Sequence, residues 1–236
     1  MDFSVVSDNL VYFLIGGWPH AGLGGLALTL ALSVVSALAS GVLGLAGGIA
    51  LSLLRGPWRA VCLLVLGLGR AIPVVMLIFW ISFLLPLVLG IDVPGVTTVM
   101  VALSLAGGAY LAHSVDAGIR SLPSGQWQAG AALGLTRVQV LRLVILPQAL
   151  PMMLPSFVNQ WIALVKDTSL AYVIGVAELS FVATQVSNRV MVHPTEIFLF
   201  AAAVYYMLCA TLELLANRHA RRWQGADSVE QARVRQ

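Results

Sequence analysis

Charged residues are scarce in this chain, and their scarcity excludes a soluble fold. They make up 10% of its 236 residues, whereas a typical soluble domain has about 25%. Hydrophobic residues make up 59%, and the mean hydropathy is +0.93. A chain of this composition lacks the polar surface that a water-soluble domain needs. We therefore expect an integral membrane protein.

Lysine is almost absent, and the basic residues that exist are arginines. Lys166 is the only lysine, and no Lys or Arg precedes Arg55. The arginines then come in small groups between apolar runs, which is the distribution of the positive-inside rule rather than of a basic face. The formal net charge of +3 therefore does not predict a nucleic-acid partner.

Motifs that carry catalysis or bind metals are also missing. The chain has no G-x-x-x-x-G-K-[ST], and no glycine-rich loop precedes its single lysine, so P-loop ATP hydrolysis is excluded. Spaced His and Cys ligand sets and a G-x-S-x-G elbow are absent too. We expect no catalytic residues, no metal site and no cofactor bound by this chain.

Five apolar stretches are long enough to cross a bilayer, which takes about 20 helical residues. The second stretch is interrupted by Arg70 and Pro73, so we expect residues 60–70 near the inner interface and residues 72–90 as the span. The expected fold is therefore all-α, with about five transmembrane helices. The other four spans are expected at residues 23–54, 96–117, 150–174 and 197–216.

Arginine-rich connections all fall on one side of these spans, which predicts that this side is cytoplasmic. Residues 1–22 would then lie outside, residues 23–218 would form one transmembrane domain, and residues 219–236 would be a cytoplasmic tail, mobile after Gln224. The first residues lack a basic n-region, so no cleaved signal peptide is expected. Near the inner end of the third span, Asp116 and Arg120 are spaced for an i,i+4 pair.

The cytoplasmic connection, residues 120–147, predicts a helix, a glycine bend and a second helix. Ser124 is a candidate N-cap, and Gly134 is placed as a left-handed stop. Thr136 and Gln139 have the spacing of a capping box that starts a second helix toward Pro147. The small side chains of the first helix would let another protein approach closely. An ordinary amphipathic helix pair at the interface is the alternative.

The fourth span carries polar residues that are costly in a membrane and by default indicate a substrate pathway or a buried partner. Asn159 and Lys166 are seven positions apart, as are Gln160 and Asp167, so each pair returns to nearly the same helix face. Asp167, Thr168 and Ser169 are residue types that commonly cap helix N-termini, which predicts a break in the helix at this place. Snorkelling of the lysine with simple capping of a turn is the alternative. The residues are Asn159, Gln160, Lys166, Asp167, Thr168 and Ser169.

Several segments resemble a known family. The pattern QAG-x3-G-x9-V-x-LP, residues 128–147, closely resembles the EAA loop of permease subunits of ATP-binding-cassette (ABC) importers. The run NQWIALVKDTSLAYVIGVAEL, residues 159–179, with GAYLAHSVDAGIRSLPSGQW and RAIPVVM, resembles the permeases of polar amino-acid importers. Within that family, RAIPVVMLIFW and TEIFLFAAAVYY look most like the glutamate/aspartate type. In the loop, Gln128 replaces the family's leading Glu and Gly130 its second Ala.

The resemblance implies a type I importer permease in the bacterial inner membrane, with its N-terminus outside and its C-terminus in the cytoplasm. It implies three protein partners and membrane lipid: an ABC ATPase that binds ATP and Mg²⁺, a second permease subunit, and a periplasmic amino-acid-binding protein. The substrate would cross by alternating access. The residues implied in coupling to the ATPase are Gln128, Ala129, Gly130, Ala131, Gly134 and Arg137.

Two other functions are compatible with the residues alone. A secondary transporter would use Asp167 or Glu178 to carry a coupling proton, and a non-transporting membrane assembly subunit would need neither. For Glu178, Glu196 and Glu213, which lie at or near the ends of spans, the residues favour solvated positions over functional ones.

Overall fold

The computed structural model of the protein describes residues 4–20 and 22–234, and most of them are helical. Within these residues, β structure is limited to one bridge between Gly25 and Glu178. The elements in chain order are α1 (Ser4–Asp8), α2 (Leu10–Ile15), α3 (Gly25–Leu53), α4 (Gly56–Ala71), α5 (Val74–Phe79), the π-helix η1 (Trp80–Leu84), α6 (Leu85–Leu89), α7 (Gly95–Ser121), α8 (Ser124–Ala132), α9 (Arg137–Val140), the π-helix η2 (Leu141–Ile145), α10 (Leu146–Asp167), the 3₁₀-helix η3 (Thr168–Ile174), α11 (Leu179–Val190) and α12 (Pro194–Val234).

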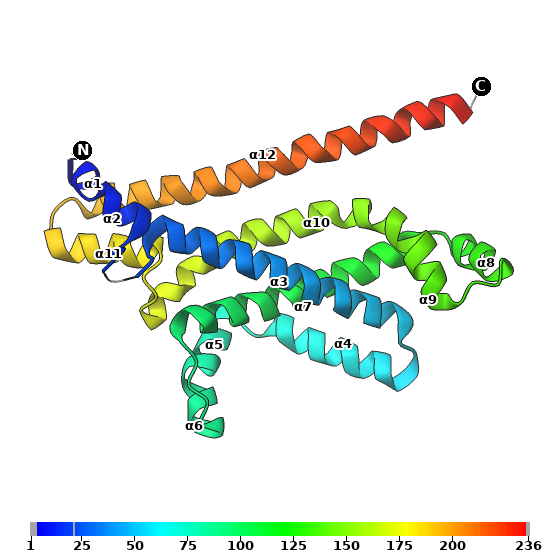
Figure 1. Ribbon diagram of the computed structural model, residues 1–236, viewed down its shortest axis with the longest axis horizontal. Coiled ribbons are helices and arrows are strands. Elements are labelled where there is room, and N and C mark those ends of the chain that lie inside the picture. The colour runs from blue at the N-terminus through cyan, green and yellow to red at the C-terminus, as the bar shows by residue number, and fades with distance from the viewer. Residues whose placement is uncertain (1–3, 21, 235–236) are drawn as a thin grey trace.

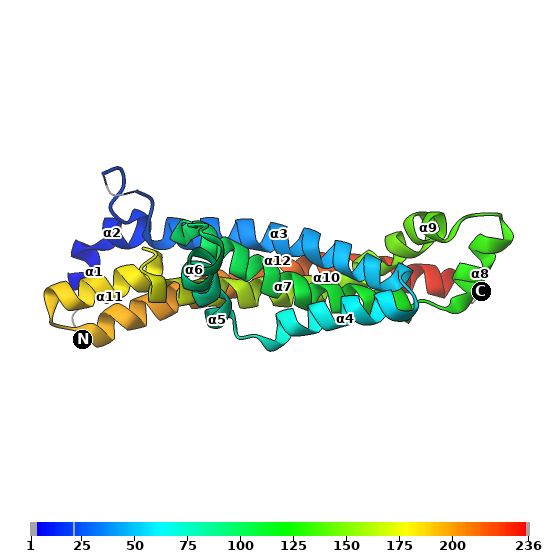
Figure 2. The same ribbon diagram turned by 90° about the horizontal axis from the view of Figure 1, so that it is seen from below.

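The long helices run along one axis and form an elongated bundle (Figures 1 and 2). The elements α1, α2 and α11 lie at one end, which we call the α11 end, together with the start of α12. The short helices α8 and α9 lie at the opposite end, the α8–α9 end. The N- and C-termini lie at opposite ends of the bundle, as an odd number of crossings requires.

Four helical segments are long and apolar enough to cross a membrane, and a bent pair, α4 with α5–α6, is a fifth candidate. The expectation of an all-α fold with about five spans is therefore confirmed. The four single segments are Gly25–Leu53, Gly95–Ser121, Arg137–Ile174 and Pro194–Ala216. Beyond the last of these, α12 stays helical as far as Val234, through the segment for which a mobile tail was expected.

The second apolar stretch is arranged differently from the expectation. Its first half, α4, lies along α3 and α7, and its second half, α5–α6, turns away by 97° (Figures 1 and 2). The break falls at Ile72 and Pro73, because a residue before proline avoids the helical region. Arg70, at the end of α4, stacks on the ring of Tyr110 in α7 at 5.0 Å. Residues 60–70 therefore pack in the bundle. The charge of Arg70 had instead suggested a position near the inner interface.

The second loop helix also does not stop near Pro147. It continues through η2 and α10 as one helical segment from Arg137 to Ile174. Pro147 occupies the first turn of α10, where its missing N–H removes a bond in the i→i−4 ladder. The turn immediately before Pro147 is π-helical, with backbone hydrogen bonds between residues five positions apart instead of four. The helix therefore continues past the proline. The loop is therefore joined directly to a span.

Small residues bring α3 and α7 into the closest helix–helix contact of the bundle. Buried small side chains recur every four residues along α3, which forms a stripe on one face. A Cβ atom at Gly44 would overlap Leu111 of α7, and one at Gly48 would overlap Val115. Such stripes let transmembrane helices pack backbone to backbone. The α3 stripe consists of Ser36, Ser40, Gly44, Gly48 and Ser52.

We predict that Gly44→Ala lowers the thermal unfolding midpoint of the detergent-solubilised chain, because the added methyl group must displace Leu111. Overpacking of this kind costs about 1–3 kcal/mol. Gly67→Ala is the matched control, since Gly67 is also helical but has open space around it. Equal midpoints for the two variants would contradict the proposed role of the stripe.

Candidate functional site: the α8–α9 loop and the polar face of α10

The first half of the loop is a helix ended by a Schellman motif. Gly134 has φ +77°, and its N–H bonds to the carbonyl of Ala131 at 3.0 Å, while the N–H of Leu135 bonds to the carbonyl of Gly130 at 3.2 Å. The left-handed stop at Gly134 is confirmed. The N-cap expectation is wrong by one position: Pro123 occupies the cap, and Ser124 is the first helical residue. Proline leads here because its fixed φ suits the entry to a helix.

The second half begins with the expected capping box. The backbone N–H of Gln139 donates to Oγ1 of Thr136 at 3.3 Å, and the backbone N–H of Thr136 donates to the Gln139 side chain at 2.8 Å. Both bonds involve residues three positions apart, so the local spacing determines them.

Gly130 provides space for a contact between the two helices of the loop. It is buried, and a Cβ atom on it would lie 2.6 Å from Cγ2 of Val140 in α9. The glycine is needed so that α8 can pack on α9, a reason that the sequence pattern did not suggest. Gln128, Ala129 and Ala131 are instead exposed on α8, and Gly134 is exposed at the bend. The loop thus presents small side chains outward around a rigid turn.

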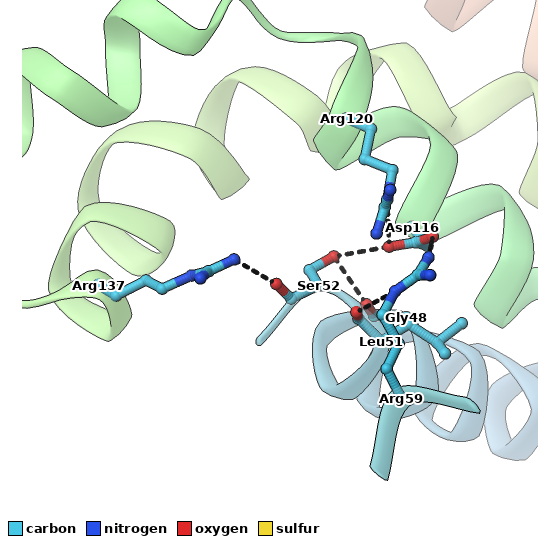
Figure 3. Close-up of polar contacts among 7 residues, drawn as sticks. All are labelled: Gly48, Leu51, Ser52, Arg59, Asp116, Arg120 and Arg137. Carbon is cyan, nitrogen blue, oxygen red and sulfur yellow. Dashed lines mark hydrogen bonds and ion pairs between the residues drawn. The ribbon is translucent and has the colours of Figure 1, made fainter. Parts of the chain in front are cut away.

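Ser52, the last residue of the α3 stripe, joins the loop to the bundle (Figure 3). The guanidinium of Arg137 donates to the backbone carbonyl of Ser52 at 2.9 Å. The hydroxyl of Ser52 donates to Oδ1 of Asp116 on α7 at 3.2 Å. One residue therefore contacts both the loop and the neighbouring span.

Asp116 also forms ion pairs with two arginines at the same place (Figure 3). Its Oδ1 pairs with Arg120 at 3.0 Å, which confirms the expected i,i+4 pair, and its Oδ2 pairs with Arg59 of α4 at 3.3 Å. The carboxylate is nearly buried, with 12% of its side chain exposed, whereas Arg120 is 55% exposed. Asp116 thus joins α4 and α7 at the α8–α9 end, and Ser52 adds α3.

Apolar contacts reinforce these polar ones. Val140 and Ile145 of the loop are buried against Val115 and Ile119 of α7. Trp127 of α8 packs on the same cluster, and its ring lies 5.6 Å from the Arg137 guanidinium. The loop is therefore held against the spans by a packed apolar base and by hydrogen bonds.

The polar residues of α10 lie on a face that is largely free in this chain. Asn159 and Lys166 are exposed, Gln160 and Asp167 are half-buried, and both pairs share a face as their spacing predicts. The α-helix ends at Asp167 and tightens into η3, so a change of helix type occurs where a break was expected.

Thr168 and Ser169 do not cap a helix. Their hydroxyls donate to the carbonyls of Val165 and Lys166, each at 2.7 Å, and Asp167 forms no side-chain cap bond. Hydroxyl groups within a helix commonly bond back to a carbonyl three or four residues earlier, which the N-cap interpretation overlooked. Thr168 is fully buried, whereas Ser169 is half-buried.

A large groove lies on the other side of α10. It is a groove of about 790 Å³ between α2, α3, α10 and α12, lined almost entirely by apolar side chains that include Trp161 and Val165. A polar solute would lose its hydration there without gaining hydrogen bonds. The polar face with Asn159 and Lys166 is therefore the better candidate for contact with a polar substrate.

Comparisons with known proteins identify the family of the chain. Residues 40–225 match the family described as the binding-protein-dependent transport system inner membrane component. The chain belongs to this family. It is an integral membrane permease component, so the secondary-transporter alternative is set aside.

Three relatives illustrate the match. The chain is 34% identical to the L-cystine transport system permease protein TcyB of Bacillus subtilis (strain 168), over 87% of each chain. It is 37% identical to the glutamine transport system permease protein GlnP of Escherichia coli (strain K12), over 77% of this chain and 86% of the relative. A solved amino acid ABC transporter chain superposes with a TM-score of 0.81 at 26% identity, covering 94% of this chain and 99% of the other.

The environment of Glu178 in this permease differs from the solvated position that was expected from the sequence. It is fully buried, not solvated, and its carboxylate accepts from the backbone N–H groups of Ser180 and Phe181, each at 2.9 Å, and from the hydroxyl of Tyr205 at 2.6 Å. It therefore caps α11 and ties it to α12. Burial raises the pKa of Glu178, and the hydrogen bonds from Tyr205, Ser180 and Phe181 oppose that rise.

Glu196 is also buried, at 8% exposure, and lies 3.5 Å from Nδ1 of His193, whereas Glu213 is exposed as expected. The two errors have one cause. Position near a span end does not reveal that α11 folds back and packs on the start of α12. Glutamate is also not a preferred N-cap type, so the residue itself gave little signal.

We predict that Glu178→Gln lowers the thermal midpoint of the permease, because an amide cannot accept all three of the hydrogen bonds that the carboxylate accepts. The loss of one charge-assisted bond costs about 1.5–3 kcal/mol. Glu213→Gln makes the same chemical change at an exposed site and should leave the midpoint unchanged. A midpoint lowered equally by both substitutions would argue against a structural role for Glu178.

Proposed function

We propose that this chain is the permease subunit of an ABC importer for a polar amino acid, and that it pairs with a second permease subunit. An ATPase subunit would dock on the exposed surface of α8 around Ala131 and Gly134. A periplasmic binding protein would deliver the substrate at the α11 end. ATP and Mg²⁺ would be bound by the ATPase, since this chain has no phosphate-binding loop.

The main support is the rigid connection between the loop and the spans. Arg137 bonds to Ser52 of α3, the loop packs on α7, and α9 continues into α10 without a stop. A displacement applied to α8 would therefore reach three spans at once. Such a connection suits alternating access, in which packed elements move as rigid bodies between two states.

The direction of insertion follows from the arginines. Arg55, Arg59, Arg120, Arg137 and Arg142 belong to the elements at the α8–α9 end. By the positive-inside rule, this end faces the cytoplasm, and the N-terminal elements face the exterior. ATPase docking at the cytoplasmic end agrees with this orientation.

The polar face of α10 supports both a path and a second subunit. Asn159 and Lys166 are exposed in the single chain, and exposed polar groups are costly against lipid. A second permease subunit would enclose this face and leave the apolar groove on the lipid side. The names of the relatives favour an amino acid as the substrate: cystine, glutamine, or glutamate and aspartate.

Docking is tested by Ala131→Trp in cells that express the complete importer. Ala131 is exposed and its substitution leaves the loop backbone unstrained, so the bulky ring should only obstruct the ATPase surface. We expect co-purification of the ATPase to fall at least ten-fold while the permease still inserts. Val192→Trp, an exposed position near the α11 end, is the control and should co-purify normally. Normal co-purification of Ala131→Trp would contradict the docking site.

The path is tested by Asn159→Ala, measured as ATP-driven amino-acid uptake by the reconstituted importer. The loss of one hydrogen bond to a passing polar substrate, about 1 kcal/mol, should reduce uptake about five-fold. Thr211→Ala removes a hydroxyl on the apolar groove and should leave uptake unchanged. If only Thr211→Ala reduces uptake, the substrate crosses on the other side of α10.

A further inference from the structure

Positive charge accumulates at the α8–α9 end beyond what the chain neutralises. Arg59 and Arg120 pair with Asp116, the one acidic side chain of the described residues that pairs with an arginine here. Arg55, the N-cap of α4, and Arg137, the first residue of α9, add two further guanidinium groups at this end. These four guanidinium groups and the exposed Arg142 of η2 are opposed by one paired carboxylate among the described side chains, so positive charge is in excess here.

A pocket of about 380 Å³ opens among these groups, between the end of α7 and the loop. Its polar lining residues are Ser52, Arg120, Ser124 and Arg137, and Leu122 and Trp127 are among its apolar ones. Each guanidinium has five N–H donors, and its hydrogen bonds to described residues use a single nitrogen, Nε of Arg120 and one terminal nitrogen of Arg137. Donors therefore remain for an anion.

The chemistry of this pocket fits a phosphate that carries an apolar body. Arginine binds phosphate oxygens through paired N–H donors. A free anion would not need the apolar wall, whereas a phospholipid places its phosphate beside its glycerol and acyl groups. Tryptophan is typical of the membrane–water boundary, and basic pockets between transmembrane helices on the cytoplasmic side bind anionic headgroups.

We propose that this pocket binds the headgroup phosphate of an anionic phospholipid from the cytoplasmic leaflet. One phosphate would contact Arg120 of α7 and Arg137 of the loop, and so would join the loop to the span next to the Ser52 bond. The lipid would neutralise the repulsion between these arginines. This site is separate from the substrate path and does not depend on which amino acid is carried.

The experiment uses the delipidated full-length chain in detergent, titrated with phosphatidylglycerol or with phosphatidylcholine of the same acyl chains. Native mass spectrometry counts the lipid that stays bound. We expect the wild-type chain to bind phosphatidylglycerol at least ten-fold more tightly than phosphatidylcholine. Arg137→Gln should weaken phosphatidylglycerol binding about five-fold, the contribution of one arginine near an anionic headgroup. Arg137→Lys keeps the charge and should retain most of the affinity.

Arg142→Gln is the matched control, because Arg142 is an exposed arginine of the same helical segment that does not line the pocket. It should bind phosphatidylglycerol like the wild-type chain. Ser124→Asp is a second test that leaves Arg137 in place: a carboxylate in the first turn of α8 is favourable for the helix but repels the phosphate. It should also weaken binding about five-fold.

Three outcomes would overturn the proposal. Equal losses for Arg137→Gln and Arg142→Gln would mean diffuse attraction by surface charge. Displacement of phosphatidylglycerol by millimolar inorganic phosphate would indicate a site for a free anion. Binding of phosphatidylglycerol by the isolated chain but not by the purified complex with the ATPase would assign the pocket to an acidic side chain of that partner.

Discussion

The close approach of α3 and α7 is the constraint on which the rest of this permease depends. In a membrane, the hydrophobic effect does not drive helices together, so association requires close packing and hydrogen bonds. The small-residue stripe of α3 provides the packing, since Cβ atoms at Gly44 and Gly48 would overlap side chains of α7. The stripe ends at Ser52, so the contact that joins the spans also positions the residue that holds the loop.

The loop gains its rigidity from several independent contacts. Its bend is held by a Schellman motif and a capping box, and its base is buried against Val115 and Ile119 of α7. Arg137 adds a bond to α3, and the π-helical turn lets the loop continue into α10 past Pro147. These contacts attach the loop to α3, α7 and α10 together, as the proposed transmission of force from an ATPase requires.

The two faces of α10 differ in polarity. One face lines an apolar groove with α3 and α12, and the other exposes Asn159 and Lys166. At the α11 end, by contrast, Glu178 and Tyr205 bond to each other within the chain and join α11 to α12. The exposed polar groups of α10 are the reason that we propose a second permease subunit on this face.

Structural features that depend on interactions between residues close together in the chain could be predicted from the sequence. The bend at Gly134, the Thr136–Gln139 capping box and the Asp116–Arg120 pair each join residues within a few positions, so spacing alone determines them. The membrane class and the number of spans follow from composition and length, because a bilayer requires about 20 apolar residues per helix.

Contacts between distant segments were decided only by the tertiary structure. Arg137 and Ser52 are 85 positions apart, and Arg59 and Asp116 are 57 apart. The direction of α4, the burial of Glu178 at the start of α11 and the packing of Gly130 against Val140 depend equally on which helices become neighbours. No spacing rule contains that information, because these partners meet only after the small-residue faces of the spans have packed together.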